Sequence, residues 1–188
     1  MGGAKRLRYC VNNEWRVSKT TKYMPVTNSS TGEVMAEAPC CTVEEVNSAV
    51  AAAKEAFPGW SAKPIQQRTD VMFHFRTLLE AHLEELTLSV SMELGKNIEE
   101  ARGDIIKVME VVEMACGAPI LMQGDALMNV STGHDTVLYR EPLGVFAGIV
   151  PFNFPAMIPF GWMIPLCITL GNTFVLKRSE ERRGGKEC

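Results

Sequence analysis

The chain has 188 residues, of which 46% are hydrophobic and 22% are charged, and its formal net charge is −3. A chain of this length and composition can bury a core, so we exclude intrinsic disorder. Without a basic excess and with only 7% aromatic residues, it lacks the composition of a protein that binds nucleic acid or an anionic membrane surface.

The six cysteines and three histidines are scattered along the chain, without the spacing of a metal site or a C-x-x-C pair. A secreted disulfide scaffold would be shorter and denser in cysteine. The basic N-terminus is not followed by the apolar stretch of a signal peptide. We therefore predict free thiols, no bound metal and a cytoplasmic location.

Short strands are predicted within the first 41 residues. Residues 9–11 and 15–17 flank Asn12-Asn13-Glu14, which favours a hairpin turn. Residues 27–32 are turn formers, and residues 34–36 are typical of one more strand.

Three amphipathic helices are predicted next. The first begins with a capping box at residues 42–45 and stops at Pro58-Gly59. The second runs from about Gln66 to Gly95. The third opens at Asn97, whose side chain can cap it, and ends at Gly117. Helical spacing predicts two buried stripes. In the second helix the stripe is Val71, Phe75, Leu78, Leu79, Leu86 and Val90, and in the third it is Ala101, Ile105, Val108, Val112 and Ala115.

The C-terminal part predicts strands and a βαβ unit. Residues 136–140 are typical of a strand that follows a Thr-Gly-His-Asp turn. An apolar strand at 145–150, an apolar helix over 155–170 kinked by Pro159 and Pro165, and a strand at 173–176 form a right-handed βαβ unit. Residues 142–176 carry no charge, so a transmembrane helix is the alternative. Five prolines and four glycines interrupt that stretch, and we favour the buried βαβ unit.

Ligands bind at the carboxyl ends of the strands in an open α/β sheet. Asn153 follows the first of these strands, and its amide either bonds its own turn or directs an N–H at a developing oxyanion. Lys177 ends the second strand, where its ammonium either reaches solvent or binds ribose hydroxyls or a phosphate. The chain has no G-x-G-x-x-G motif, and Gly144-x-x-x-Gly148 indicates simple packing.

These same segments carry a family resemblance. Residues 144–159 (GVFAGIVPFNFPAMIP) and 171–177 (GNTFVLK) resemble the aldehyde dehydrogenase superfamily. The PFNFP sequence at 151–155 is typical of its CoA-acylating branch, the methylmalonate (malonate) semialdehyde dehydrogenases. Residues 93–96 (ELGK) and 117–124 are similar to that branch too.

The resemblance implies a fold and a domain plan. The fold would be α/β, the N-terminal part of a Rossmann-like NAD-binding domain. Residues 1–126 would form an N-terminal arm and the helical part, 127–143 a β oligomerisation segment, and 144–177 the first βαβ unit. Residues 178–188 place a cluster of charges after a buried strand, so we predict that they are a non-native tail. The catalytic domain would be absent.

The resemblance also implies chemistry. A small-molecule aldehyde would be oxidised by NAD through a cysteine thioester, and the acyl group would pass to coenzyme A. Asn153 would stabilise the oxyanion, Val150 and Phe152 would line the cofactor site, and Lys177 would contact the adenosine ribose. A homo-oligomer is implied.

Lys107 stands where the semialdehyde branch carries an arginine for the substrate carboxylate. Lysine offers only a point charge in place of a bidentate fork. A different aldehyde is therefore one alternative, and a solvated helix residue without a substrate role is another.

The nucleophilic cysteine of the family lies in a later domain. We therefore assign that role to neither Cys116 nor Cys167, and predict that this fragment alone is inactive. The competing hypothesis is a non-catalytic truncated module that binds NAD or associates with other subunits.

Overall fold

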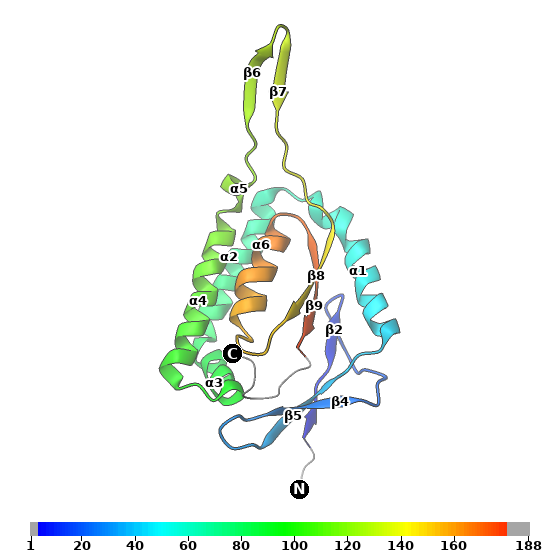
Figure 1. Ribbon diagram of the computed structural model, residues 1–188, viewed down its shortest axis with the longest axis vertical. Helices are drawn as coiled ribbons and strands as arrows, with labels where there is room; N and C mark the ends of the chain where they lie inside the picture. Colours follow the sequence, from blue (N-terminus) through cyan, green and yellow to red (C-terminus); the bar gives the residue numbers. More distant parts are fainter. Residues whose placement is uncertain (1–3, 180–188) are drawn as a thin grey trace.

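The computed structural model describes residues 4–179, and its central feature is a parallel pair of strands between two helical layers (Figure 1). Helix α1 (Val43–Ser61) packs on one side of strands β8 (Val145–Val150) and β9 (Thr173–Arg178), and η1 (Met157–Met163) and α6 (Ile164–Thr169) pack on the other. Helix α4 (Ile98–Cys116) then covers η1 and α6, and α2 (Ile65–Ala81) covers α6. A small N-terminal sheet lies at one end of the molecule, and a hairpin projects from the other.

The N-terminal strands form two small sheets. Their bounds are β1 (Lys5–Arg6), β2 (Tyr9–Val11), β3 (Glu14–Arg16), β4 (Tyr23–Thr27) and β5 (Val34–Pro39). The predicted hairpin is confirmed as β2 paired antiparallel with β3, and Asn12 and Asn13 both have positive φ, as a type I′ turn requires. Strand β4 was not predicted, and it contains Pro25. This proline is tolerated because β4 lies at the edge of the sheet, in the order β1-β5-β4, where a missing backbone N–H need not break a ladder.

Helix α1 (Val43–Ser61) begins as predicted but ends later. The capping box is confirmed, since the Thr42 hydroxyl accepts a hydrogen bond from Glu45 N and the Glu45 carboxylate accepts one from Thr42 N. The predicted stop at Pro58-Gly59 is wrong. The last turn continues past Pro58, whose carbonyl oxygen accepts a hydrogen bond from Ala62 N at 3.2 Å, and the Trp60 indole N–H in this turn donates to the Ile168 carbonyl oxygen at 2.7 Å.

The predicted second helix is two helices, α2 (Ile65–Ala81) and α3 (Leu83–Leu94). His82, with φ −108° and ψ 17°, separates them. Because this break resets the helical phase, a single apolar stripe cannot continue through both. Leu79 and Val90 are buried as expected. Val71 and Leu78 are exposed, because the buried face of α2 is the one that carries Arg68, Met72 and Leu79.

Helix α4 (Ile98–Cys116) matches its prediction. The Asn97 side chain accepts a hydrogen bond from Glu100 N at 2.9 Å, and the short helix α5 (Ala118–Leu121) follows. All five residues predicted for its buried face are buried. Three of them, Val108, Val112 and Ala115, belong to the main core cluster with Met72 and Met157.

The projecting hairpin pairs β6 (Ala126–Ser131) with β7 (His134–Val137). The predicted strand at 136–140 is misplaced, because Gly133 takes φ +73° and allows a tight turn that ends one residue before β7. Every residue of both strands is exposed.

The predicted βαβ unit is confirmed as a parallel pair of strands. Its elements are β8 (Val145–Val150), η1 (Met157–Met163), α6 (Ile164–Thr169) and β9 (Thr173–Arg178). The crossover changes from a wide π-helical turn to α-helix at Ile164, beside Pro165. The Thr173 hydroxyl donates to the Ala53 carbonyl oxygen at 2.9 Å and so joins β9 to α1. No helix within residues 4–179 is both long and apolar enough to span a membrane.

A buried arginine ties the helices to the end of α6. Arg68 Nε donates to Thr169 O at 2.9 Å, and its Nη1 donates to Ser61 O at 2.9 Å and Lys63 O at 2.8 Å. Burial lowers the pKa of this guanidinium. The carbonyls that it contacts lie at or next to helix C-termini, where the macrodipole favours a cation.

Candidate active site

The carboxyl ends of β8 and β9 lie side by side. In the parallel register Ile149 faces Lys177 and Val150 faces Arg178. Val150 is buried, whereas the Lys177 side chain is exposed at this edge. Phe152 and Asn153 follow Val150 after Pro151, and both are exposed. The structure thus gathers four of the five predicted site residues at one edge of the sheet.

Asn153 occupies the turn after β8 with its amide open to solvent. Within the part of the chain that the structure describes, no hydrogen bond joins this amide to its own turn or to another residue. The next residue, Phe154, is half-buried and packs against the main core cluster. The amide is therefore carried by an anchored turn and is available to a ligand.

The opposite end of the sheet is fixed by Asn172, a residue that the sequence did not single out. Its Oδ1 accepts hydrogen bonds from Leu143 N at 2.7 Å and Gly144 N at 3.0 Å, and its Nδ2 donates to Cys167 O at 3.2 Å. Asn172 is buried, so these bonds satisfy an amide that would otherwise be costly. These bonds help to fix the register between β8 and β9, and the register determines how their carboxyl ends align.

Gly148 allows η1 to approach the sheet. A Cβ at this position would lie 2.5 Å from Phe174 Cζ and 3.1 Å from Met163 Sδ. This agrees with the packing role predicted for Gly148, since any side chain would push these neighbours away.

Lys107 lies apart from the strand-end residues. It is on the exposed side of α4 and forms an ion pair with Glu110, one turn along the same helix. Among residues 4–179, no hydrogen bond or ion pair joins Lys107 to the turn after β8 or to Lys177. The structure therefore does not bring the fifth predicted residue together with the other four.

Three of the half-buried cysteines, Cys41, Cys116 and Cys167, have poorly nucleophilic thiols. Burial raises the pKa of Cys167 to about 11 and also raises the pKa of Cys116 and of Cys41. Since the thiolate is the nucleophile, these side chains are protonated at neutral pH and suit packing. The five described cysteines are all free of disulfide bonds, and Cys188 lies outside the described residues.

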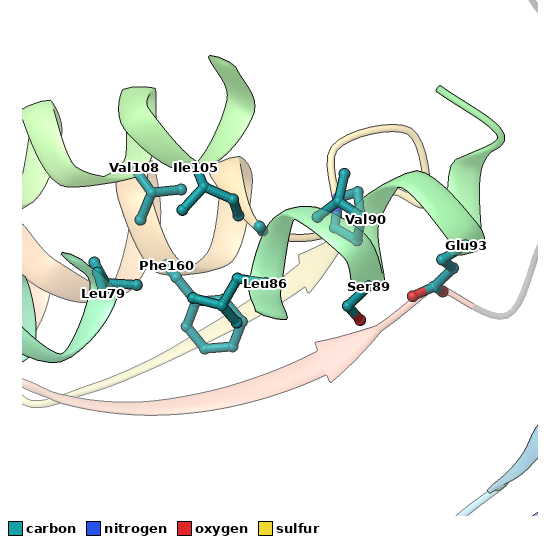
Figure 2. A pocket seen from close by; sticks show the side chains of 10 residues that line it. Leu79, Leu86, Ser89, Val90, Glu93, Ile105, Val108 and Phe160 are labelled. Carbon is teal, nitrogen blue, oxygen red and sulfur yellow. The ribbon is translucent and has the colours of Figure 1, made fainter. Parts of the chain in front are cut away.

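A cleft of about 170 Å³ lies where the turn after β8 meets the helices. Its walls come from α2, α3 and α4 and from Pro155, Ala156 and Phe160. Figure 2 shows Ser89 and Glu93 as the polar side chains of an otherwise apolar lining. The cleft backs the turn and is separate from the exposed amide of Asn153.

Lys96 lies against the residue that follows Asn153, and the sequence did not single it out. Its ammonium donates to Asp104 Oδ2 at 2.6 Å and lies 4.5 Å from the centroid of the Phe154 ring. The ELGK sequence at 93–96 was the available signal, but it gave no indication of which side chain Lys96 contacts.

Comparison with protein families gives one match, to the aldehyde dehydrogenase family over residues 15–183. The match runs into residues 178–188, the predicted tail, of which residues 180–188 lie outside the described part. Strand β9 itself includes Arg178.

Curated relatives carry a more specific name. The malonate-semialdehyde dehydrogenase of Listeria monocytogenes serotype 4a (strain HCC23) is 45% identical over 180 residues, which are 96% of this chain and 37% of that protein. Malonate-semialdehyde dehydrogenase 1 of Geobacillus thermodenitrificans (strain NG80-2) is 47% identical over 178 residues, which are 95% of this chain and 37% of that protein. The chain therefore spans little more than a third of the length of these relatives.

Solved structures agree with this fold. The methylmalonate-semialdehyde dehydrogenase of Oceanimonas doudoroffii has a TM-score of 0.89 and 40% identity, covering 94% of this chain and 36% of that one. A protein of Sinorhizobium meliloti 1021, assigned to the methylmalonate-semialdehyde dehydrogenases and solved with NAD, has a TM-score of 0.90 and 35% identity, covering 96% and 36%. The predicted α/β fold is thereby confirmed. Because the family match covers most of its residues, the chain belongs to the aldehyde dehydrogenase family.

Proposed function

We propose that this chain is the N-terminal part of a cytoplasmic, NAD-dependent and CoA-acylating aldehyde dehydrogenase of the methylmalonate (malonate) semialdehyde type. The observation that carries the proposal is the exposed Asn153 amide in the PFNFP turn, at the same sheet edge as Lys177. The names of the relatives and the NAD complex of one similar structure support it.

The groups at this edge fit a nucleotide cofactor. The exposed ring of Phe152 offers an apolar face, and the exposed ammonium of Lys177 offers a donor for ribose hydroxyls. Buried Val150 gives the edge a firm apolar floor. The chain has no glycine-rich phosphate loop. These side chains therefore suit the ribose and the rings of the cofactor, and the edge has no loop that would bind its pyrophosphate tightly. NAD, when bound, would accept the hydride.

Asn153 would act on the substrate. Its amide N–H would donate to the carbonyl oxygen as negative charge develops there, and the anchored turn would hold the donor in place beforehand. The cysteine nucleophile and the coenzyme A site would come from a later part of the protein. This division of labour is why we expect the fragment alone to be inactive.

A second candidate substrate follows from Lys107. Lys107 offers a point charge, already paired with Glu110, where an arginine would offer a bidentate fork. If position 107 faces the substrate in the full-length protein, this replacement favours an aldehyde without a carboxylate over a semialdehyde.

We also propose that the β6–β7 hairpin makes contact between subunits of a homo-oligomer. It projects from the molecule, and its exposed side chains include Leu127, Met128 and Val130. Exposed apolar side chains gathered on one projecting element are typical of an interaction surface.

The test begins with the gene. The reading frame should be recovered through and beyond the Lys177 codon, and the full-length protein assayed for NADH formation. We expect NADH with malonate semialdehyde, methylmalonate semialdehyde or propanal, and an acyl-CoA product when coenzyme A is added. NADH without an acyl-CoA would contradict the CoA-acylating branch. A frame that stops after Cys188, with NAD binding but no turnover, would favour the non-catalytic module.

In the full-length enzyme, we expect Asn153→Ala to lower kcat by about 10²–10³ and to leave the KM for NAD nearly unchanged, since one oxyanion donor is lost. Steady-state kinetics at saturating NAD measures this. Asn47→Ala, at an exposed position of α1, is the matched control and should keep the parent kcat. Equal rates for both variants would rule out the role of Asn153.

A further inference from the structure

A largely buried lysine lies behind the turn that carries Asn153. The side chain of Lys96 is 24% exposed and that of its partner Asp104 is 14% exposed. The ammonium lies between the Asp104 carboxylate, at 2.6 Å, and the face of the Phe154 ring, 4.5 Å from its centroid. A cation that has lost most of its water interacts more strongly with an aromatic face than an exposed one does.

The backbone on both sides of Lys96 is anchored. Gly95 ends α3 with φ +73°, and a Cβ there would lie 3.3 Å from Ser29 Cβ. The Ser29 hydroxyl donates to Glu93 O at 2.5 Å, and the Ser91 hydroxyl donates to Lys96 O at 2.7 Å. The loop from the N-terminal sheet therefore braces the end of α3. Lys96 reaches the ring from a fixed starting point.

Phe154 is the residue next to Asn153. Its ring is held by the core cluster on one side and by the Lys96 ammonium on another. The Asn153 amide has no partner of its own within the described residues, so its direction depends on the backbone of its neighbours. A ring that shifts would carry that backbone with it.

We propose that Lys96 is a positioning residue for Asn153, acting through the Phe154 ring and held by Asp104. This inference rests on the proposed oxyanion role of Asn153. It assigns to the ELGK segment a place in the same site as the PFNFP turn, although the two lie more than fifty residues apart in sequence.

A purely structural role for the ion pair is the alternative, and the chain offers a matched control. Arg102 of α4 and Glu84 of α3 form a second ion pair near the first, but this pair is more exposed, and no hydrogen bond or ion pair among residues 4–179 joins it to the turn after β8. Arg102→Met removes a bridge from α4 to α3 and leaves Phe154 untouched, whereas Lys96 lies just after α3.

The experiment uses the full-length enzyme. We expect Lys96→Met to lower kcat by about tenfold while the KM for NAD and for aldehyde changes little, because a misplaced donor weakens transition-state contacts more than ground-state binding. Lys96→Arg, which keeps a cation over the ring, should recover most of kcat. Arg102→Met should keep the parent kcat. Thermal unfolding of each variant reports any general loss of stability.

A double-mutant cycle then decides whether Lys96 acts through Asn153. In the Asn153→Ala background, Lys96→Met should cost less than about twofold in kcat, because the group that it positions is gone. A full tenfold further loss would overturn the inference, and so would an equal loss in Arg102→Met. If Lys96→Met alone does not fold, Lys96→Met/Asp104→Asn removes both charges and serves in its place. Failure of Asn153→Ala to lower kcat is a separate outcome, which overturns the oxyanion role itself and the inference with it.

Discussion

At the scale of single residues, Glu45 shows how local and distant contacts combine. Its carboxylate is the capping-box acceptor for Thr42 N at 2.8 Å, and it also accepts from the Ser18 hydroxyl and from Lys19 N, both at 2.7 Å. Burial raises the pKa of Glu45, but these three hydrogen bonds outweigh it and leave the pKa below its usual value. The sequence predicted the capping box, which is local. It could not predict Ser18 and Lys19, which reach Glu45 only through the fold.

The pH dependence of stability follows from that pKa. The unfolded pKa of a glutamate is about 4.3, and the folded value is lower, so the stabilisation is complete above the unfolded pKa and is lost as pH falls through the folded one. We expect Glu45→Gln to lower the free energy of unfolding by about 1–3 kcal/mol at pH 7, with the difference shrinking in acid. Urea denaturation at pH 7 and at low pH measures it. Glu55→Gln, at an exposed position of α1, should change little at either pH. A pH-independent difference would contradict the prediction.

At the scale of elements, a helix was predicted well where neighbouring residues in the sequence determine its ends. Helix α4 is an example, because Asn97 caps its N-terminus and its buried face follows the apolar spacing. The end of α1 and the break at His82 are not, because the Trp60 bond to Ile168 lies outside any local window and nothing near His82 marks a stop. Strand β8 matches its predicted bounds because a short apolar run between turn formers suits a buried parallel strand.

Close packing of β8 against η1 gives a prediction of its own. Gly148→Val places atoms where Phe174 and Met163 now lie, so we expect a loss of about 1–3 kcal/mol in the free energy of unfolding. Gly103→Ala is the control on α4, where a Cβ meets nothing within 4 Å, and it should stabilise the protein by up to about 1 kcal/mol. Chemical denaturation of the two variants is the measurement. Equal stability of Gly148→Val and the parent would show that η1 can yield.

At the scale of the whole molecule, the topology of a βαβ unit was enough to place Asn153 and Lys177 at one edge. It was not enough to place Lys96 or Asn172, because their partners come from other elements whose packing the sequence does not display. Lys107 was located on its helix correctly, but the ion pair to Glu110 was not foreseen. The sheet edge that carries the candidate site was therefore predictable, and the residues that hold this edge in place were not.

The open side of the two-stranded sheet predicts how the 188-residue chain behaves alone. Ile149 on β8 is 74% exposed, Leu143 just before β8 is 87% exposed, and a sheet of two parallel strands has two unpaired edges. Such surfaces favour association between copies. We expect a polydisperse product on size-exclusion chromatography with light scattering. A single monomeric species that unfolds cooperatively would show that 188 residues suffice.

The hydrogen bonds that join α1 and α2 to the βαβ unit form only after a delay during synthesis, because their partners are far apart in sequence. Trp60 and Ile168 are separated by 108 residues, Arg68 and Thr169 by 101, and Ala53 and Thr173 by 120. At a translation rate of about 5–20 residues per second, the ribosome needs roughly 5 to 25 seconds to make the later partner. During that interval the nascent helices carry an uncovered apolar face and an arginine whose carbonyl partner on α6 has not been made. The chain therefore has a built-in period in which a chaperone that binds apolar helices would protect it most.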